Sequence, residues 1–195
     1  MKKRFSIFFI ITCILGSLIQ ISYASDWQAK KSQWITVENY EVHFEMPANW
    51  EFFNDFISIP LLVKSPKRDQ GRVVISVTPF NIDNIEFDHD EIERNQKLYR
   101  KGREKWLSEV HGESIDYFPY QVEKWEKAKE VQRIGFSFLL NNIAYSEHSY
   151  YVNCRDHIFH LKALYRHDDY LKDQHEIQNI IKTFDCRPPE TSPGS

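Results

Sequence analysis

The alternation of apolar and polar residues predicts strands in the first third of the chain. Residues 34–37 and 40–46 both alternate, and the Glu38-Asn39 pair between them fits a turn. Residues 59–63 are predicted to form another apolar strand. Residues 72–78 are rich in β-branched side chains, which is typical of a central strand buried on both faces. We therefore expect a hairpin followed by central strands of a sheet.

Two segments have the 3.6-residue periodicity of helices. The first begins with Asp88 as a cap and Glu91 three residues later, ends at Gly112, and has an apolar stripe of Ile92, Tyr99, Trp106 and Val110. The second begins at Asp173 and has one apolar face made of Ile177, Ile180, Ile181 and Phe184. Both helices are predicted to lie on a sheet.

Four further strands are predicted between the two helices, at residues 118–128, 131–140, 143–153 and 157–166. The order of strands, helix, strands and helix favours an α+β fold with a mostly antiparallel sheet covered by helices. We expect one such domain at residues 34–186, a flexible lead-in at 25–33 and a disordered tail at 187–195.

The first 24 residues have the pattern of a secretory signal peptide. Lys2, Lys3 and Arg4 precede an apolar stretch, and Ser22-Tyr23-Ala24 places small residues where a signal peptidase acts, so cleavage is predicted after Ala24. The alternative is an uncleaved anchor, for which the apolar stretch is short. The protein is therefore predicted to be periplasmic or secreted.

Charge and cysteine content change when this segment is removed. The whole chain has 195 residues and a net charge of -3; the remainder has 22 basic and 28 acidic residues, a net charge of -6, which argues against nucleic-acid binding. Cys13 is lost as well. Cys154 and Cys186 then form an even pair, which in an exported protein indicates a disulfide, with free thiols or a metal site as alternatives.

Three segments resemble the PsbP-like, or Ran-binding Mog-like, family of α/β/α sandwiches. They are the end of the first hairpin at residues 46–50, the late hairpin from Tyr150-Tyr151-Val152 to Phe159-His160-Leu161, and the last helix with its Ile177, Ile180, Ile181 and Phe184 pattern. The resemblance covers about Trp34 to Phe184 and implies a binding or assembly factor. It supplies no catalytic residues, and the cysteine pair is not part of the family pattern.

The sequence has no phosphate-binding glycine loop, no nucleophile elbow and no zinc-protease helix. We therefore predict no catalytic residues, no metal and no cofactor. Two acidic clusters, residues 88–91 and His167-Asp168-Asp169 with His175, could bind a divalent cation, but both also fit ordinary helix starts.

Two histidines and several aromatic residues remain open to more than one interpretation. His148 and His160 lie on adjacent predicted strands and could form a pH-sensitive pair, although two solvent-facing histidines are the favoured interpretation. Tyr120 and Val122 fall on the opposite strand face from Trp125. If the strand has no bulge, one of these faces leaves aromatic side chains near solvent as a binding patch; the alternative is that helices cover both faces of the sheet.

A basic cluster on the first helix is the candidate binding surface. It consists of Lys97, Arg100, Lys101, Arg103 and Lys105. An acidic partner could dock there, or glutamates on the same helix could balance it as an ordinary solvated face.

These observations predict an exported, non-catalytic binding or accessory protein of the bacterial envelope or secretome. We expect a protein partner and no contact with the membrane after signal cleavage. The first alternative is a small exported hydrolase that uses Asp, Glu and His, which a deep pocket holding several of His148, His160, Asp168 and Asp169 would favour. The second is a divalent-metal-binding protein.

Overall fold

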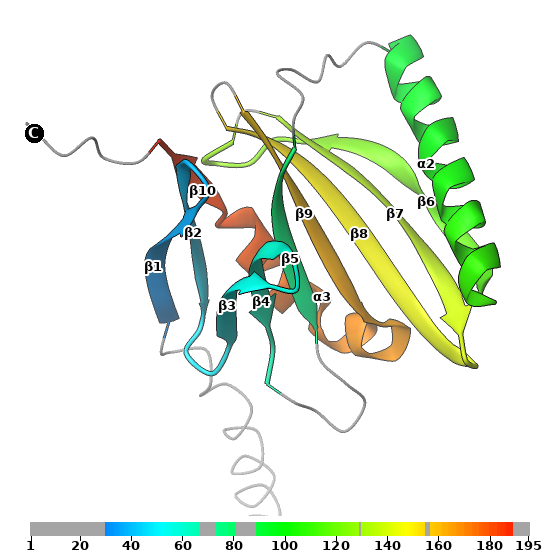
Figure 1. Cartoon of the computed structure of the whole chain (residues 1–195), viewed down its shortest axis with the longest axis horizontal. Helices are drawn as coiled ribbons and strands as arrows, with labels where there is room; N and C mark the ends of the chain where they lie inside the picture. The colour runs from blue at the N-terminus through cyan, green and yellow to red at the C-terminus, as the bar shows by residue number, and fades with distance from the viewer. Residues whose placement is uncertain (1–29, 67–72, 81–88, 129, 155–156, 189–195) are drawn as a thin grey trace, which may run out of the picture.

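A computed structural model describes residues 30–66, 73–80, 89–128, 130–154 and 157–188, so the predicted signal peptide lies outside the described residues. Figure 1 shows their arrangement. The strands are β1 (Lys30–Val37), β2 (Tyr40–Pro47), β3 (Glu51–Phe56), β4 (Ile59–Lys64), β5 (Val74–Phe80), β6 (Glu113–Glu123), β7 (Val131–Leu140), β8 (Ile143–Cys154), β9 (His157–Arg166) and β10 (Asp185–Arg187). The helices are α2 (His89–Val110) and α3 (His167–Lys182).

Seven strands form one large antiparallel sheet in the order β3-β4-β5-β9-β8-β7-β6. Strands β6 to β9 follow one another in space as in sequence, because short connections join antiparallel neighbours. Strand β5 pairs with β4 on one side and β9 on the other, and so joins β3 and β4 to the late strands. The predicted α+β fold class is confirmed.

A smaller sheet of β1, β2 and β10 corrects two predicted boundaries. The turn at Glu38-Asn39 sets the hairpin register so that Lys30 lies opposite Pro47, and β1 therefore begins within the expected lead-in. At the other end of the chain, Arg187 pairs with Glu41 in β2, although residue 187 was expected to begin the tail. The Nε of Arg187 lies 2.7 Å from Oε2 of Glu41.

The main core lies between one face of the large sheet and a layer made of α3 and the small sheet. Phe44 of β2, Phe159 of β9 and Phe184 after α3 are fully buried and in ring contact, with centroids 5.1 Å and 5.7 Å apart. Trp50 and Ile177 are also part of this core. Burial of such side chains stabilises the fold by about 1.5–3 kcal/mol each.

Helix α2 covers the opposite face of the sheet along β6 and β7, as Figure 1 shows. Tyr99 and Trp106 of the predicted stripe contact Phe136 and Phe138 of β7 edge to face. Leu107, which the predicted stripe omitted, is the most buried residue of this helix face, at 3% exposure.

Two other elements differ from their predicted bounds. Helix α3 begins at His167, six residues before the predicted start at Asp173. The prediction missed its first turns because they are polar and give no apolar periodicity. Strand β6 begins at Glu113 rather than Phe118 and ends at Glu123, with register irregularities between residues 114 and 121. Trp125 lies beyond the strand, where its backbone N–H donates to the carbonyl of Ala128 at 3.2 Å.

Within the described residues, neither helix combines the length and the apolar character needed to cross a membrane.

Candidate partner-binding surface

The predicted basic cluster lies on α2, but its five residues do not share one role. Arg103 points toward the sheet, where its guanidinium lies 3.1 Å from the carboxylate of Glu147 on β8. The Glu147 side chain is only 5% exposed; it also accepts a hydrogen bond from the Tyr99 hydroxyl at 3.3 Å, and the Lys162 ammonium lies 4.0 Å away. Arg103 also lies over the ring of Phe136. Arg103 is therefore the partner of a buried carboxylate.

The other four cations lie on the side or outer face of α2. Arg100 lies over the ring of Tyr117, 5.1 Å from its centroid. Lys97 pairs with Glu93 at 2.8 Å, and Lys105 approaches Glu109 at 4.0 Å, both as exposed helix pairs. Such pairs contribute only a few tenths of a kcal/mol. Lys101 is exposed between them. Three lysines spaced four residues apart therefore form an outer basic stripe.

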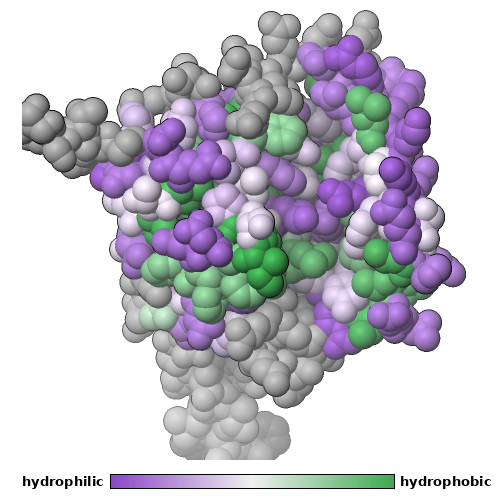
Figure 2. Space-filling model, viewed as in Figure 1, coloured by the Kyte–Doolittle hydropathy of each residue, from purple (hydrophilic) through white to green (hydrophobic). Residues whose placement is uncertain are grey.

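The outer face of α2 also presents an exposed leucine and a glycine. Leu98 is 60% exposed beside the stripe. Figure 2 shows this side of the molecule as mainly hydrophilic, with hydrophobic side chains among the hydrophilic ones. Gly102 lies in mid-helix, and a Cβ built there would meet nothing within 4 Å. We call Lys97, Leu98, Lys101, Gly102 and Lys105 the α2 outer face.

Replacing Gly102 with alanine will stabilise the fold by about 0.5–1 kcal/mol. The substitution restricts the unfolded chain and creates no clash, since the space around the position is open. Urea unfolding measures the gain. A loss of stability would show that the glycine has a packing role in the fold.

The two histidines do not form a pair. His148 lies opposite Ala163, and His160 lies opposite Tyr151, so the two side chains project from opposite faces of the sheet. His148 is only 5% exposed, and the expectation that both histidines face solvent is wrong for this residue. His160 is half-buried, stacked on Tyr151 at 4.8 Å. A hydrolase site containing both histidines is therefore contradicted.

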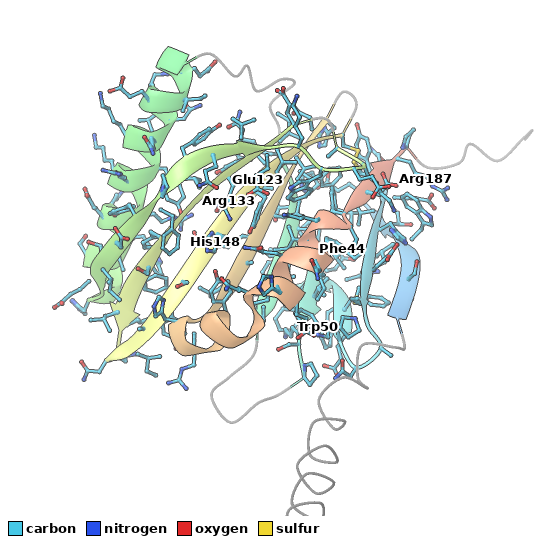
Figure 3. All side chains as sticks on the ribbon, turned by 180° about the vertical axis from the view of Figure 1, so that it is seen from behind. Phe44, Trp50, Glu123, Arg133, His148 and Arg187 are labelled. Atoms are coloured by element: carbon cyan, nitrogen blue, oxygen red, sulfur yellow. A yellow bond between two sulfur atoms is a disulfide. The ribbon has the colours of Figure 1, made fainter. Side chains whose placement is uncertain are left out.

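His148 is held in an aromatic stack that depends on a glycine. Its ring is parallel to that of Phe118, with centroids 4.7 Å apart, and Tyr165 stacks at 5.8 Å. Gly135 lies opposite Phe118 on one side and His148 on the other. A Cβ at residue 135 would approach the backbone oxygen of Glu147 to 2.5 Å, so only glycine fits this position. Figure 3 shows His148 near Arg133, which pairs with Glu123 at 3.1 Å.

A His148→Gln variant will show a flatter dependence of stability on pH than the unmodified protein. Burial, together with the charge of Arg133, lowers the pKa of His148 to about 3 in the folded state. The unfolded chain takes up a proton near pH 6.5 that the folded chain does not bind. The stability contributed by this residue is therefore complete above pH 6.5 and decreases below it, by up to about 1.4 kcal/mol per pH unit.

Urea unfolding at pH 7, 6 and 5 measures this dependence. His175, which is exposed on α3, provides the matched control His175→Gln. The control should follow the unmodified protein, and equal slopes in all three proteins would contradict the prediction.

The candidate metal-binding clusters lie largely outside the described side chains. Asp88 of the first cluster lies outside the described residues. In the second cluster, the His167 and His175 side chains have different surroundings. Nδ1 of His167 lies 3.0 Å from the Ser146 hydroxyl, and His175 is exposed. Among the side chains that the structure describes, no group of three or more His, Cys, Asp or Glu residues is arranged to hold a metal ion.

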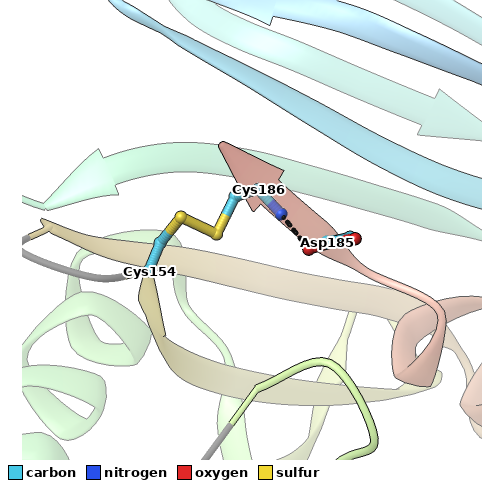
Figure 4. Close-up of a disulfide and its surroundings, with 3 residues drawn as sticks. All are labelled: Cys154, Asp185 and Cys186. Atoms are coloured by element: carbon cyan, nitrogen blue, oxygen red, sulfur yellow. Dashed lines mark hydrogen bonds between the residues drawn. A yellow bond between two sulfur atoms is a disulfide. The ribbon is translucent and has the colours of Figure 1, made fainter. Parts of the chain in front are cut away.

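The structure joins Cys154 to Cys186, as the cysteine count predicted (Figure 4). The Cα atoms lie 5.9 Å apart, within the usual range for a disulfide. Cys154 ends β8 of the large sheet, and Cys186 lies in β10 of the small sheet, where its N–H donates to Oδ1 of Asp185 at 2.8 Å. The bond therefore links the two sheets.

The sequence pattern did not predict two surface features. The β3–β4 hairpin exposes Phe53, Phe56 and Ile57, and the ammonium of Lys64 lies over both phenylalanine rings. The second is a cleft beside the end of α3. Trp125, in contrast, is core, at 7% exposure, so its side of the predicted strand is covered, whereas Val122 is exposed.

Comparison with known proteins identifies the fold. No family model and no curated protein matches the sequence. Among solved structures, the chain is similar to cyanobacterial PsbP (CyanoP) from Synechocystis sp. PCC 6803, with a TM-score of 0.57 and 10% identity over 84% of this chain and 96% of that one. It is also similar to LpqN, involved in cell envelope biogenesis of Mycobacterium tuberculosis, with a TM-score of 0.51 and 10% identity over 83% and 93%. The chain has a PsbP-like fold, as the sequence resemblance predicted.

Proposed function

We propose that this chain is an exported accessory protein of the bacterial envelope or secretome, which binds an acidic protein partner through the α2 outer face. The main support for the proposal is that the basic cluster has one inward-facing residue and a row of outward-facing lysines. Arg103 has a partner in the core, whereas Lys97, Lys101 and Lys105 face outward beside the 60% exposed Leu98. A stripe of lysines on a chain with a net negative charge suits an acidic partner, and Leu98 supplies apolar contact area beside the stripe.

The export part of the proposal rests on the signal-like segment and on the disulfide. Disulfides persist in oxidising compartments and are rare in the cytoplasm, and Cys154–Cys186 joins two separate sheets here. LpqN, with the same fold, is involved in envelope biogenesis, which agrees with an accessory role outside the cytoplasm.

Cross-linking followed by affinity capture from envelope and culture-medium fractions tests the proposal. We expect one or more acidic proteins, whose recovery falls at least fivefold in Lys97→Glu/Lys101→Glu/Lys105→Glu. Recovery should also fall in 0.5 M salt, because exposed charges are screened.

Lys127 provides a matched control for a single charge reversal. Lys101 and Lys127 are both exposed lysines, one on α2 and one in the connection after β6. Lys101→Glu should reduce recovery, and Lys127→Glu should leave it unchanged. Failure to capture a partner, or equal recovery by both variants, would overturn the proposal.

A further inference from the structure

A cleft of about 390 Å³ is lined by Met46, Trp125 and Ile180 of the main core, on the α3 side of the large sheet, whereas α2 covers the opposite face. Three segments far apart in the sequence border it: the end of β2, the connection after β6 and the last turn of α3. Its lining consists of Glu45, Met46, Lys124, Trp125, Glu126, Asn179, Ile180, Lys182 and Thr183. The volume falls within the range of small-ligand pockets, about 300–1,000 Å³.

The floor of the cleft is apolar and firmly held. Met46, Trp125 and Ile180 are 1%, 7% and 1% exposed, so each presents one edge to the cleft and buries the rest in the core. The Trp125 indole N–H donates to Glu123 at 3.1 Å, which fixes the ring. Thr183 joins two walls, since its hydroxyl accepts the N–H of Glu45 at 2.9 Å. The floor is therefore already formed without a ligand.

The rim carries charges that are not paired within the described chain. Lys124 and Lys182 come from different elements and border the same cleft, and no described side chain forms an ion pair with either one. Glu126 and Asn179 are likewise without a described side-chain partner. With Glu45, which also lines the cleft, two ammonium groups, two carboxylates and one amide thus surround an apolar floor.

We propose that this cleft binds the carboxyl-terminal end of a peptide whose last residues are apolar. The terminal carboxylate pairs with Lys124 and Lys182, and the apolar side chain rests on Met46 and Ile180. The last peptide N–H groups donate to Glu126 or to the Asn179 amide oxygen. A peptide end supplies an anion, backbone donors and an apolar group together, and the cleft offers a partner for each.

Fluorescence anisotropy tests the proposal with the purified exported protein. The probe is an amino-terminally labelled Gly-Ser-Gly-Ser-Val-Leu peptide with a free carboxylate, compared with the same peptide ending in an amide. We expect saturable binding of the acid, and at least tenfold weaker binding of the amide. Equal binding of the two, or no saturation at millimolar protein, would overturn the proposal.

Variants locate the binding and separate a peptide from a small carboxylate. Lys124→Ala/Lys182→Ala should weaken binding at least tenfold, Lys124→Arg/Lys182→Arg should retain it, and the neighbouring Lys127→Ala should leave it unchanged. Competition by N-acetyl-leucine should be at least tenfold weaker than by the unlabelled peptide. Equal competition would overturn the peptide assignment. Because the cleft and α2 lie apart, these outcomes are independent of the α2 proposal.

Discussion

Arg103→Met will lower the free energy of unfolding by about 2–4 kcal/mol at pH 7, because it leaves the buried Glu147 carboxylate without its closest cation. Methionine keeps most of the apolar contact that the arginine stem makes with Phe136. The Tyr99 hydroxyl and the Lys162 ammonium remain near the carboxylate, so the loss should be smaller than for a fully isolated buried charge. Urea unfolding monitored by circular dichroism measures the change.

A second substitution separates the unpaired charge from a packing defect. Arg103→Met/Glu147→Gln removes the charge and keeps an oxygen for Tyr99, so it should recover at least half of the lost stability. The exposed control Lys105→Met should change stability by no more than about 0.5 kcal/mol. A double variant as unstable as Arg103→Met would contradict the pairing.

Removal of the disulfide in Cys154→Ala/Cys186→Ala will lower the free energy of unfolding by about 3–4 kcal/mol in the chain-entropy model, because the bond closes a loop with a sequence separation of 32 residues. The bond also links the large sheet to the small one, so its loss should weaken the attachment of β10 to β2. Urea midpoints and m values for the oxidised protein and the double variant measure the effect.

Reduction of the unmodified protein provides the control for this prediction. Dithiothreitol should lower its stability to near that of the double variant and should leave the variant itself unchanged. A loss below about 1 kcal/mol in both experiments would show that the two sheets are held together by packing alone.

Local patterns predicted the elements whose sequences alternate or are strongly apolar. The predicted bounds of β7 and β9 agree with the structure, because each strand is a regular run between short turns. The polar start of α3 and the irregular β6 were misplaced, since neither has clean periodicity. The opposite faces of His148 and His160 could have been predicted from register, because Cys154 lies opposite His157 across the connection.

The remaining features depend on how distant segments pack together. The role of Arg103 is set by the packing of α2 on the sheet, which brings this side chain to Glu147 of β8, and nothing in the helix sequence separates Arg103 from the neighbouring cations. Likewise, Lys124 and Lys182 are 58 positions apart in the sequence and border one cleft only in the folded chain. Local periodicity specifies neither placement.

Site-specific photo-cross-linking shows whether the α2 outer face contacts a partner. A photo-reactive residue is placed in turn at Leu98 on α2, at Ile57 on the β3–β4 hairpin and at Val122 on β6, which are 60%, 78% and 45% exposed. We expect a cross-linked partner from position 98 and none from positions 57 and 122. A partner cross-linked from position 57 or 122, with none from position 98, would contradict this expectation.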